Sequence, residues 1–391
     1  MTDPIVILSY ARTPMGGFLG ELSGLTATEL GAVAVEGAVA RAGLAADLIE
    51  RCYMGCVLPA GLGQAPARQA ALKAGLPHSV EATTVNKMCG SAMQAAILAS
   101  DTLAAGSADV IVAGGMESMS NAPYLSPRHR AGARMGHDRL LDSMFLDGLE
   151  DAYEQGKLMG VFAEEVAGEY QFTREKQDAF AIASLTRATG HKERLANEIV
   201  PVTVKGRKGD TVVDTDEQPR NAKPDKIPTL KPAFAKDGTI TAANASSISD
   251  GAAALVLTRE SVADRLGVKP IARIAGHAAF ADAPARFTTA PVGAARRALE
   301  KAGWAIGDVD LFEVNEAFAT VAMIAMHDLG LSHDVLNIHG GACALGHPIG
   351  ASGARILGAL LNGLQVNGLK RGLASICLGG GEATAMAVEL V

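Results

Sequence analysis

The segment TTVNKMCGSAMQAAILASDTLAAG, residues 83–106, decides the fold. Its β-branched start favours a strand, the small residues around Cys89 favour a tight turn, and the alanine- and leucine-rich remainder has the apolar periodicity of a long helix. Cys89 therefore lies near the first turn of that helix, where unpaired N–H groups and the positive end of the helix dipole favour an anion. We expect Cys89 to be a reactive thiolate, although a cysteine taken at random is more often a buried structural residue.

The same alternation of apolar runs and helical stretches extends outward from this segment. It includes PIVILS (residues 4–9), RCYMGCVLP (51–59) and DVIVAGG (109–115). Such alternation predicts an α/β sheet flanked by helices. Acidic helical and proline-rich stretches between them predict a long insertion with little sheet of its own. The predicted division is an N-terminal domain of residues 1–116 and 245–269, an inserted loop domain of 117–244, and a C-terminal domain of 270–391.

The bulk properties describe an ordinary folded protein. The chain has 391 residues, 48% of them hydrophobic, and a net charge of −7. It has no basic stripe, so we expect no nucleic-acid partner. Five cysteines without framework spacing, and an N-terminus without a signal-peptide pattern, predict a cytoplasmic location. No apolar run reaches the 18 or so residues of a membrane span, so we expect no membrane association.

Two further reactive residues lie at glycine-rich turns near the C-terminus. His347 is in GGACALGHPIGASGARIL (340–357) and Cys377 is in LASICLGGG (373–381). Glycine-flanked backbone N–H groups are available to bind an oxyanion. The His347 loop with its helix and strand repeats the pattern of the Cys89 turn, helix and strand, which predicts two similar domains that share an active site at their interface. No complete dinucleotide or phosphate-loop motif occurs, and the histidine spacing does not indicate a metal site.

Four motifs carry a resemblance to a known family. They are VNKMCGSAMQA around Cys89, NEAFA at Asn315, GHPIGASGAR at His347 and CLGGG at Cys377, and they occur in order along the whole chain. With these motifs the chain closely resembles the thiolase family. The resemblance implies two related domains, each a mixed five-stranded sheet between helices, in a five-layered αβαβα arrangement with a loop domain inserted in the first.

The resemblance also implies a role for each catalytic residue. Cys89 is the nucleophile that becomes acylated, His347 is the base that increases its thiolate content, and Cys377 is the acid and base at the substrate's α-carbon. Asn315 holds a water that joins His347 in one oxyanion site, and the N–H groups of Cys89 and Gly379 form a second. The chemistry makes this division intelligible, because one thiol cannot both carry an acyl group and remove a proton from the second substrate.

For the coenzyme A portion of the substrate, the resemblance points to Arg220 near the nucleotide and to Ser246 along the pantetheine. It also implies that Met159, Phe287 and Phe318 are pocket walls. The alternative for Arg220 is a solvated loop charge, and for the pocket walls it is plain core packing. The chain departs from the common family pattern at Leu158, His339 and Glu382, and Glu382 places a carboxylate near the active-site turn without an obvious partner.

The resemblance implies reversible condensation of two acetyl-CoA molecules to acetoacetyl-CoA and coenzyme A through an acyl-cysteine. Coenzyme A is then a substrate and product, no cofactor is permanently bound, and Phe287 predicts a short acyl pocket. The alternatives are a broader 3-ketoacyl-CoA thiolase of fatty-acid or aromatic degradation, a decarboxylating ketosynthase and a non-catalytic relative. A ketosynthase usually has a second histidine where this chain has Asn315. The resemblance further implies a homo-oligomer, either a dimer or a tetramer.

Overall fold

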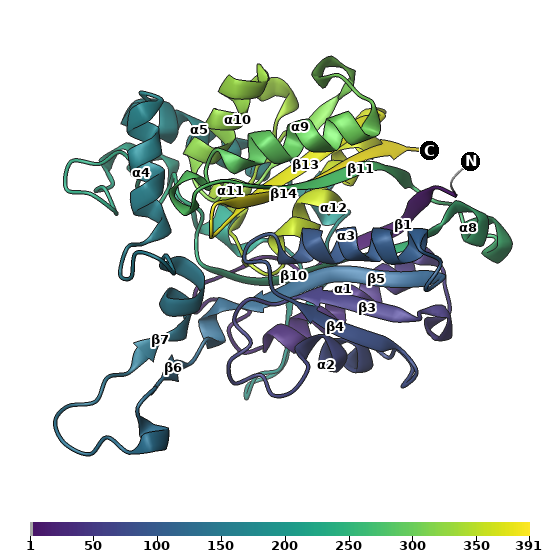
Figure 1. Cartoon of the computed structure of the whole chain (residues 1–391), viewed down its shortest axis with the longest axis horizontal. Helices are drawn as coiled ribbons and strands as arrows, with labels where there is room; N and C mark the ends of the chain where they lie inside the picture. The colour runs from purple at the N-terminus through teal and green to yellow at the C-terminus, as the bar shows by residue number, and fades with distance from the viewer. Residues whose placement is uncertain (1–2) are drawn as a thin grey trace.

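The computed structural model describes residues 3–391, which form one continuous mixed β-sheet of ten strands covered by helices (Figure 1). The strand order is β12-β13-β14-β11-β1-β10-β5-β3-β4, and β2 pairs with β10. Their bounds are β1 Ile5–Arg12, β2 Gly16–Gly17, β3 Arg51–Gly55, β4 Glu81–Val85, β5 Val110–Ser118, β10 Ser249–Arg259, β11 Ala272–Ala281, β12 Leu311–Val314, β13 Arg371–Leu378 and β14 Glu382–Leu390.

The two halves of the sheet meet at a short junction. Strands β1 and β11 are antiparallel but pair only at Val6 with Arg273 and Ile7 with Ala272. The N-terminal half has the expected five strands, β4, β3, β5, β10 and β1. The C-terminal half has four, and where a fifth would lie there is a single bridge between Phe312 and Leu336. The chain turns directly after this bridge at Asn337, whose φ is 48°. The pairing therefore does not extend beyond this one bridge.

Helices divide the molecule into five layers. Helices α1 (Ala27–Ala42) and α2 (Pro66–Lys73) cover the outer face of the N-terminal half, and α9 (Ala290–Ala302) and α10 (Ala319–Leu329) cover that of the C-terminal half. Helices α3 (Ser91–Ala104) and α12 (Ser352–Asn367) pack between the two halves (Figure 1). Helix α12 is buried on all sides from Ser352 to Leu364, as its central position requires.

Local sequence signals fix several of these helices. Thr26 accepts a hydrogen bond from the N–H of Glu29, and the Glu29 carboxylate accepts one from the N–H of Thr26, so a capping box starts α1. The same helix ends at Gly43, whose φ of 67° lies in the left-handed region that glycine adopts at no steric cost. Capping of this kind explains why the alanine-rich stretches stop where the loops begin.

The segment between β5 and β10 contains several helices and only two small two-stranded sheets. The remaining elements of the chain are β6 Tyr124–Leu125, β7 Leu141–Asp142, β8 Val202–Val204, β9 Thr211–Val213, α4 Met159–Glu169, α5 Arg174–Gly190, α6 Lys192–Ala196, α7 Glu217–Asn221, α8 Glu260–Leu266 and α11 Ala342–Leu345, with a π-helix at Phe145–Leu149 and short 3-10 helices elsewhere. The predicted domain boundaries at 116, 244 and 269 stay predictions. Within residues 3–391 no helix is both long and apolar enough to cross a membrane.

Candidate active site

An apolar cavity of about 370 Å³ brings together four of the residues predicted to be catalytic. Cys89, His347, Cys377 and Gly379 all line it, and they come from both halves of the sheet. The predicted contact residues Ser246, Met159, Phe287 and Phe318 line the same cavity. Asn315 does not line it and lies behind His347 instead, and Arg220 lies elsewhere. The structure thus gathers eight of the ten predicted residues around one space.

Cys89 sits on a strained turn between β4 and α3. The preceding Met88 has a φ of 45°, which is unusual for a residue with a side chain. The hydroxyl of Ser91 closes this turn, since it accepts a hydrogen bond from the N–H of Lys87 at 2.8 Å and donates one to the carbonyl of Met88 at 2.6 Å. Strain of this kind persists only where the surroundings impose it, and here it presents the sulfur to the cavity.

The resting charge of Cys89 differs from the sequence-based expectation. Burial in the apolar cavity raises the pKa of the Cys89 thiol to about 12, and the backbone N–H groups of Gly379 and of Cys89 itself lower it only in part. The prediction of a resting thiolate was therefore wrong, because desolvation outweighs the helix terminus. The two N–H groups nevertheless point at the sulfur, and their role as an oxyanion site for an acyl group on Cys89 stays a prediction.

His347 is held in a tight glycine turn beside α12. Gly346 has a φ of 99°, and a Cβ there would lie 2.1 Å from the Ser249 hydroxyl, so no other residue fits. The Nδ1 atom of His347 lies 2.5 Å from the Ser352 hydroxyl, and Nε2 lies 3.5 Å from Nδ2 of Asn315. Burial, with the charge of Arg355 acting in the same direction, lowers the pKa of His347 to about 3. The imidazole is therefore neutral and able to accept a proton.

Cys377 lies at the end of β13, almost wholly buried, directly before the turn Gly379–Gly381. Burial raises its pKa well above the usual range, and the neighbouring Cys89 acts in the same direction. Both cysteines are therefore neutral thiols at rest. In the turn, Gly381 has a φ of 83°, and a Cβ there would lie 2.4 Å from the carbonyl oxygen of Ala283.

The apolar walls of the cavity include residues that sequence reasoning did not identify. Phe318 packs edge to face against Phe287, with ring centroids 6.2 Å apart, and against Phe234 at 5.8 Å. Ser246 donates its hydroxyl to the carbonyl of Ala317 at 2.9 Å and so fixes the loop beneath these rings. The unpredicted wall residues are Phe145, Leu149, Phe234, Ile248 and Ile349. Phe145 and Leu149 share one π-helix and the others come from separate loops, and no local motif marks them.

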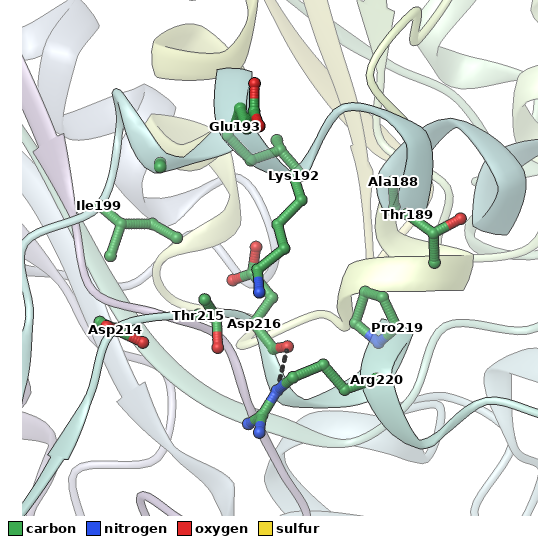
Figure 2. Close-up of a pocket in the computed structure, with 12 residues that line it drawn as sticks. Ala188, Thr189, Lys192, Glu193, Ile199, Asp214, Thr215, Asp216, Pro219 and Arg220 are labelled. Carbon is green, nitrogen blue, oxygen red and sulfur yellow. Dashed lines mark hydrogen bonds between the residues drawn. The ribbon is translucent and has the colours of Figure 1, made fainter.

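Arg220 lies outside this cavity. It is on α7 and lines a second cavity of about 420 Å³ beside α6 and the loop of Asp214–Asp216 (Figure 2). Its Nε donates to the carbonyl of Asp216 at 3.2 Å, and its guanidinium pairs with Glu21 at 2.5 Å. The structure therefore does not bring Arg220 together with the other predicted contact residues.

Glu382, which had no evident partner in the sequence, pairs with Lys87. Lys87 precedes the Cys89 turn, and Glu382 starts β14 directly after the Gly379–Gly381 turn. The ion pair is partly exposed and connects the two turns whose N–H groups point at the Cys89 sulfur. The two turns also pack closely, because a Cβ on Gly90 would lie 2.6 Å from the side chain of Leu378.

Glu117, also unpredicted, anchors the His347 loop from β5. Its fully buried carboxylate accepts hydrogen bonds from the N–H groups of Val57 at 2.9 Å, Leu58 at 3.1 Å and Gly350 at 2.9 Å. Burial raises its pKa to about 7 against the effect of these three donors. Elsewhere, the described residues contain no group of three or more metal-ligating side chains suited to a metal ion.

Comparison with known proteins places this geometry in a family. The family models for the thiolase N-terminal domain and the thiolase C-terminal domain match residues 5–261 and 268–390. The acetyl-CoA acetyltransferase of Allochromatium vinosum is 49% identical over 393 residues and covers 100% of both chains, and acetyl-CoA acetyltransferase 1 of Arabidopsis thaliana is 49% identical over 392 residues, covering 99% of this chain and 94% of its own. The crystal structure of the Bacillus anthracis acetyl-CoA acetyltransferase superposes with a TM-score of 0.97 at 38% identity, covering 100% of this chain and 99% of the other. The chain therefore belongs to the thiolase family.

Proposed function

We propose that the protein is an acyltransferase that condenses two acetyl-CoA molecules to acetoacetyl-CoA and coenzyme A, and that it also catalyses the reverse thiolysis. The observation that carries this proposal is the single cavity shared by Cys89, His347, Cys377 and the N–H of Gly379. The names of the full-length relatives, all acetyl-CoA acetyltransferases, support the same substrate class.

In the first half-reaction Cys89 attacks the thioester carbonyl of acetyl-CoA. Because the thiol is protonated at rest and His347 is neutral, His347 accepts the thiol proton as the sulfur attacks. The N–H groups of Cys89 and Gly379 stabilise the oxyanion that forms, and loss of one such donor typically costs about 2.7 to 4 kcal/mol. Coenzyme A then leaves as a thiol with the proton of the neutral Cys377 thiol, and the acetyl group stays on Cys89.

In the second half-reaction Cys377, left as a thiolate when its proton went to coenzyme A, removes a proton from the α-carbon of a second acetyl-CoA. The carbanion attacks the acetyl group on Cys89, and the departing Cys89 sulfur takes back the proton held by His347, which restores both thiols and releases acetoacetyl-CoA. Asn315 and His347 stabilise the enolate oxygen, and we retain the predicted water between them and the substrate as part of this proposal. The high pKa of Cys377 suits a group that must hold a proton between steps.

Coenzyme A is a substrate and product in this scheme, and no cofactor is permanently bound. Ser246, Met159, Phe287 and Phe318 line the cavity, which supports the proposal that the first two contact the pantetheine and the last two close the acyl end. A contact between Arg220 and the nucleotide requires its guanidinium to leave Glu21 and the Asp216 carbonyl. We further propose a cytoplasmic protein without nucleic-acid or membrane partners, as the composition favours, and a homotetramer or dimer, as the family resemblance implies.

A thiolysis assay with 3-ketoacyl-CoA substrates from four to ten carbons tests the proposal. We expect measurable turnover of the four-carbon substrate, abolished in Cys89→Ala. Cys343→Ala is the matched control, since Cys343 does not line the cavity, and we expect it to retain activity. Equal turnover of all chain lengths would instead favour the broader 3-ketoacyl-CoA thiolase, and absence of thiolysis in the folded protein would contradict acyltransferase function altogether.

A further inference from the structure

Arg355 is a buried arginine on α12 that reaches the back of the active site. Its side chain is 1% exposed, and its terminal NH2 nitrogen donates a hydrogen bond to Oδ1 of Asn315 at 3.1 Å. A guanidinium has five N–H donors and no acceptor. The oxygen of the Asn315 amide must therefore face Arg355, and its Nδ2 must face away. Nδ2 lies 3.5 Å from Nε2 of His347.

The Nδ1 side of His347 is fixed through Ser352 by the carbonyl of Pro348, which can only accept a hydrogen bond. The hydroxyl of Ser352 donates to the carbonyl of Pro348 at 3.0 Å, so its oxygen is left to accept the N–H of His347 Nδ1 at 2.5 Å. The proton of the neutral imidazole is thus on Nδ1, and Nε2 carries a lone pair that faces Nδ2 of Asn315 at 3.5 Å. A chain of hydrogen bonds therefore runs from Arg355 to the Pro348 carbonyl. In each of its hydrogen bonds the donor lies on the Arg355 side and the acceptor on the Pro348 side.

We propose that Arg355 is a positioning residue for His347, which it serves by fixing the Asn315 amide so that Nε2 of His347 stays unprotonated and ready to take the Cys89 proton. This inference rests on the proposed function, in which His347 is that base. Arg355 does not line the cavity and does not touch the reacting atoms. Its effect passes through one hydrogen bond to Asn315.

Without Arg355 the amide is free to turn over. The oxygen of Asn315 then faces Nε2 and favours a proton there, and the Ser352 hydroxyl has to turn from Pro348 to Nδ1. In that tautomer Nε2 carries a proton and cannot accept the Cys89 proton. The positive charge of Arg355 contributes to the lowering of the His347 pKa, so it helps to keep the imidazole neutral at rest.

A purely structural role explains the contacts of Arg355 less well than a positioning role. The nearest carboxylate, on Glu313, lies 3.8 Å from the guanidinium NH1, which is longer than a hydrogen bond. Within residues 3–391 the Nε and NH1 atoms of Arg355 have no hydrogen-bond partner. The hydrogen bond to Asn315 is thus the well-formed hydrogen bond of the Arg355 guanidinium, whose charge is costly to bury.

A double-mutant cycle on Cys89 reactivity tests the inference without requiring turnover. We would measure alkylation of Cys89 by iodoacetamide at pH 7, and thiolysis kcat and KM in parallel, for Arg355→Met and Asn315→Ala singly and together. We expect Arg355→Met to reduce the alkylation rate and kcat by about tenfold or more with KM little changed. In the Asn315→Ala background, Arg355→Met should reduce the alkylation rate and kcat no further. Arg355→Lys, which keeps a charged donor, should recover most of the loss.

Asn315→Asp tests the inference if Arg355→Met does not fold. This variant keeps an oxygen facing Arg355 and replaces the amide N–H that faces Nε2 of His347 with a second oxygen acceptor. We expect it to be as slow as Asn315→Ala. Arg259→Met is the control, since Arg259 is another largely buried arginine that donates hydrogen bonds, in its case to the carbonyls of Leu103 and Ala108, and it does not line the cavity; it should leave alkylation unchanged. Equal fold losses from Arg355→Met in both backgrounds, or a fast Asn315→Asp enzyme, would overturn the inference. A wild type that alkylates normally but lacks thiolysis would count against the proposed function alone.

Discussion

The two thiols in the cavity differ in what surrounds them. The Cys89 sulfur faces two backbone N–H groups, which suit a sulfur that attacks and then carries an acyl oxygen beside it. Cys377 is more deeply buried, and only its own N–H opposes the rise of its pKa. The surroundings therefore separate a nucleophile from a proton carrier, although both residues are thiols of high pKa.

This separation predicts that Cys377→Ala accepts an acetyl group on Cys89 but does not exchange the α-hydrogens of bound acetyl-CoA with solvent. Attack on the thioester needs only Cys89 and His347, whereas exchange needs the second base. Peptide mass spectrometry after acid quench measures the label, and proton exchange in deuterated water measures the second step. Label on Cys377 of the wild type, or normal exchange in the variant, would reverse the assignment.

We propose that Phe287 limits the length of the acyl chain that fits the cavity. Its ring is 2% exposed and packs against Phe318, so a longer acyl tail has to displace it. Overpacking a site of this kind costs about 1 to 3 kcal/mol, or one to two decades in rate. We expect the wild type to prefer the four-carbon over the eight-carbon 3-ketoacyl-CoA, and Phe287→Ala to reduce that preference in kcat/KM.

Phe280→Ala is the matched control for this change. Phe280 also carries a large ring, but it contacts Gly293 and Arg297 and does not line the cavity. It should lower Tm without changing the ratio of the two substrates. If the wild type already processes four- and eight-carbon substrates with similar kcat/KM, Phe287 does not close the pocket.

The sequence could point to three residues that the structure brings to one cavity because each lies in a short local motif. Cys89, His347 and Cys377 are flanked by small residues whose turns can be recognised without knowledge of the fold. The positions of Glu117 and Phe234 could not be predicted in this way, since their partners lie far along the chain. The charge state of Cys89 was missed because desolvation depends on the walls of the finished cavity.

At the scale of elements, the predicted repeat appears as two helices in the central layer. Helices α3 and α12 each follow a catalytic turn and lead to a central strand, β5 or β13. The sequence shows this order because each unit is local. It does not show the junction of β1 with β11, which consists of two residue pairs between strands more than 260 positions apart.

The Lys87–Glu382 pair joins the turns at the ends of β4 and β13, and we expect it to contribute modestly to catalysis. Both side chains are partly exposed, so solvent screens the pair, and such pairs are worth about 0.2 to 1 kcal/mol. Glu382→Gln should reduce kcat by about twofold to fivefold at low salt, and the ratio should approach one at 0.5 M sodium chloride.

The ion pair of Arg273 and Glu260 offers a control with similar exposure away from the cavity. Glu260→Gln should leave kcat unchanged at both salt concentrations. A loss of activity in Glu382→Gln that does not depend on salt would mean that the carboxylate acts in some way other than by charge pairing with Lys87.

At the scale of the whole molecule, buried titratable groups of opposite kinds surround the active site and its supports. Burial raises the pKa of Glu117 to about 7 and that of Glu313 to about 8. Burial also lowers the pKa of His347 to about 3, and those of His333 and His339 to about 4. All five depart from their unfolded values, so each makes the free energy of unfolding depend on pH.

The two sets of groups act in opposite directions and predict a stability maximum near pH 6. The raised carboxyl pKa values favour the folded state at low pH, and that stability is lost as pH rises through about 7 and 8. The lowered histidine pKa values do the reverse, since unfolded histidines bind protons up to about pH 6.5, and stability rises toward that pH. Thermal unfolding from pH 4.5 to 8.5 should therefore show Tm rising and then falling.

His339→Asn removes one of the buried imidazoles. It should make Tm depend less on pH on the acidic side and move the maximum to lower pH. A wild-type Tm that climbs steadily to pH 8 would mean instead that Glu117 and Glu313 are ionised in the folded protein.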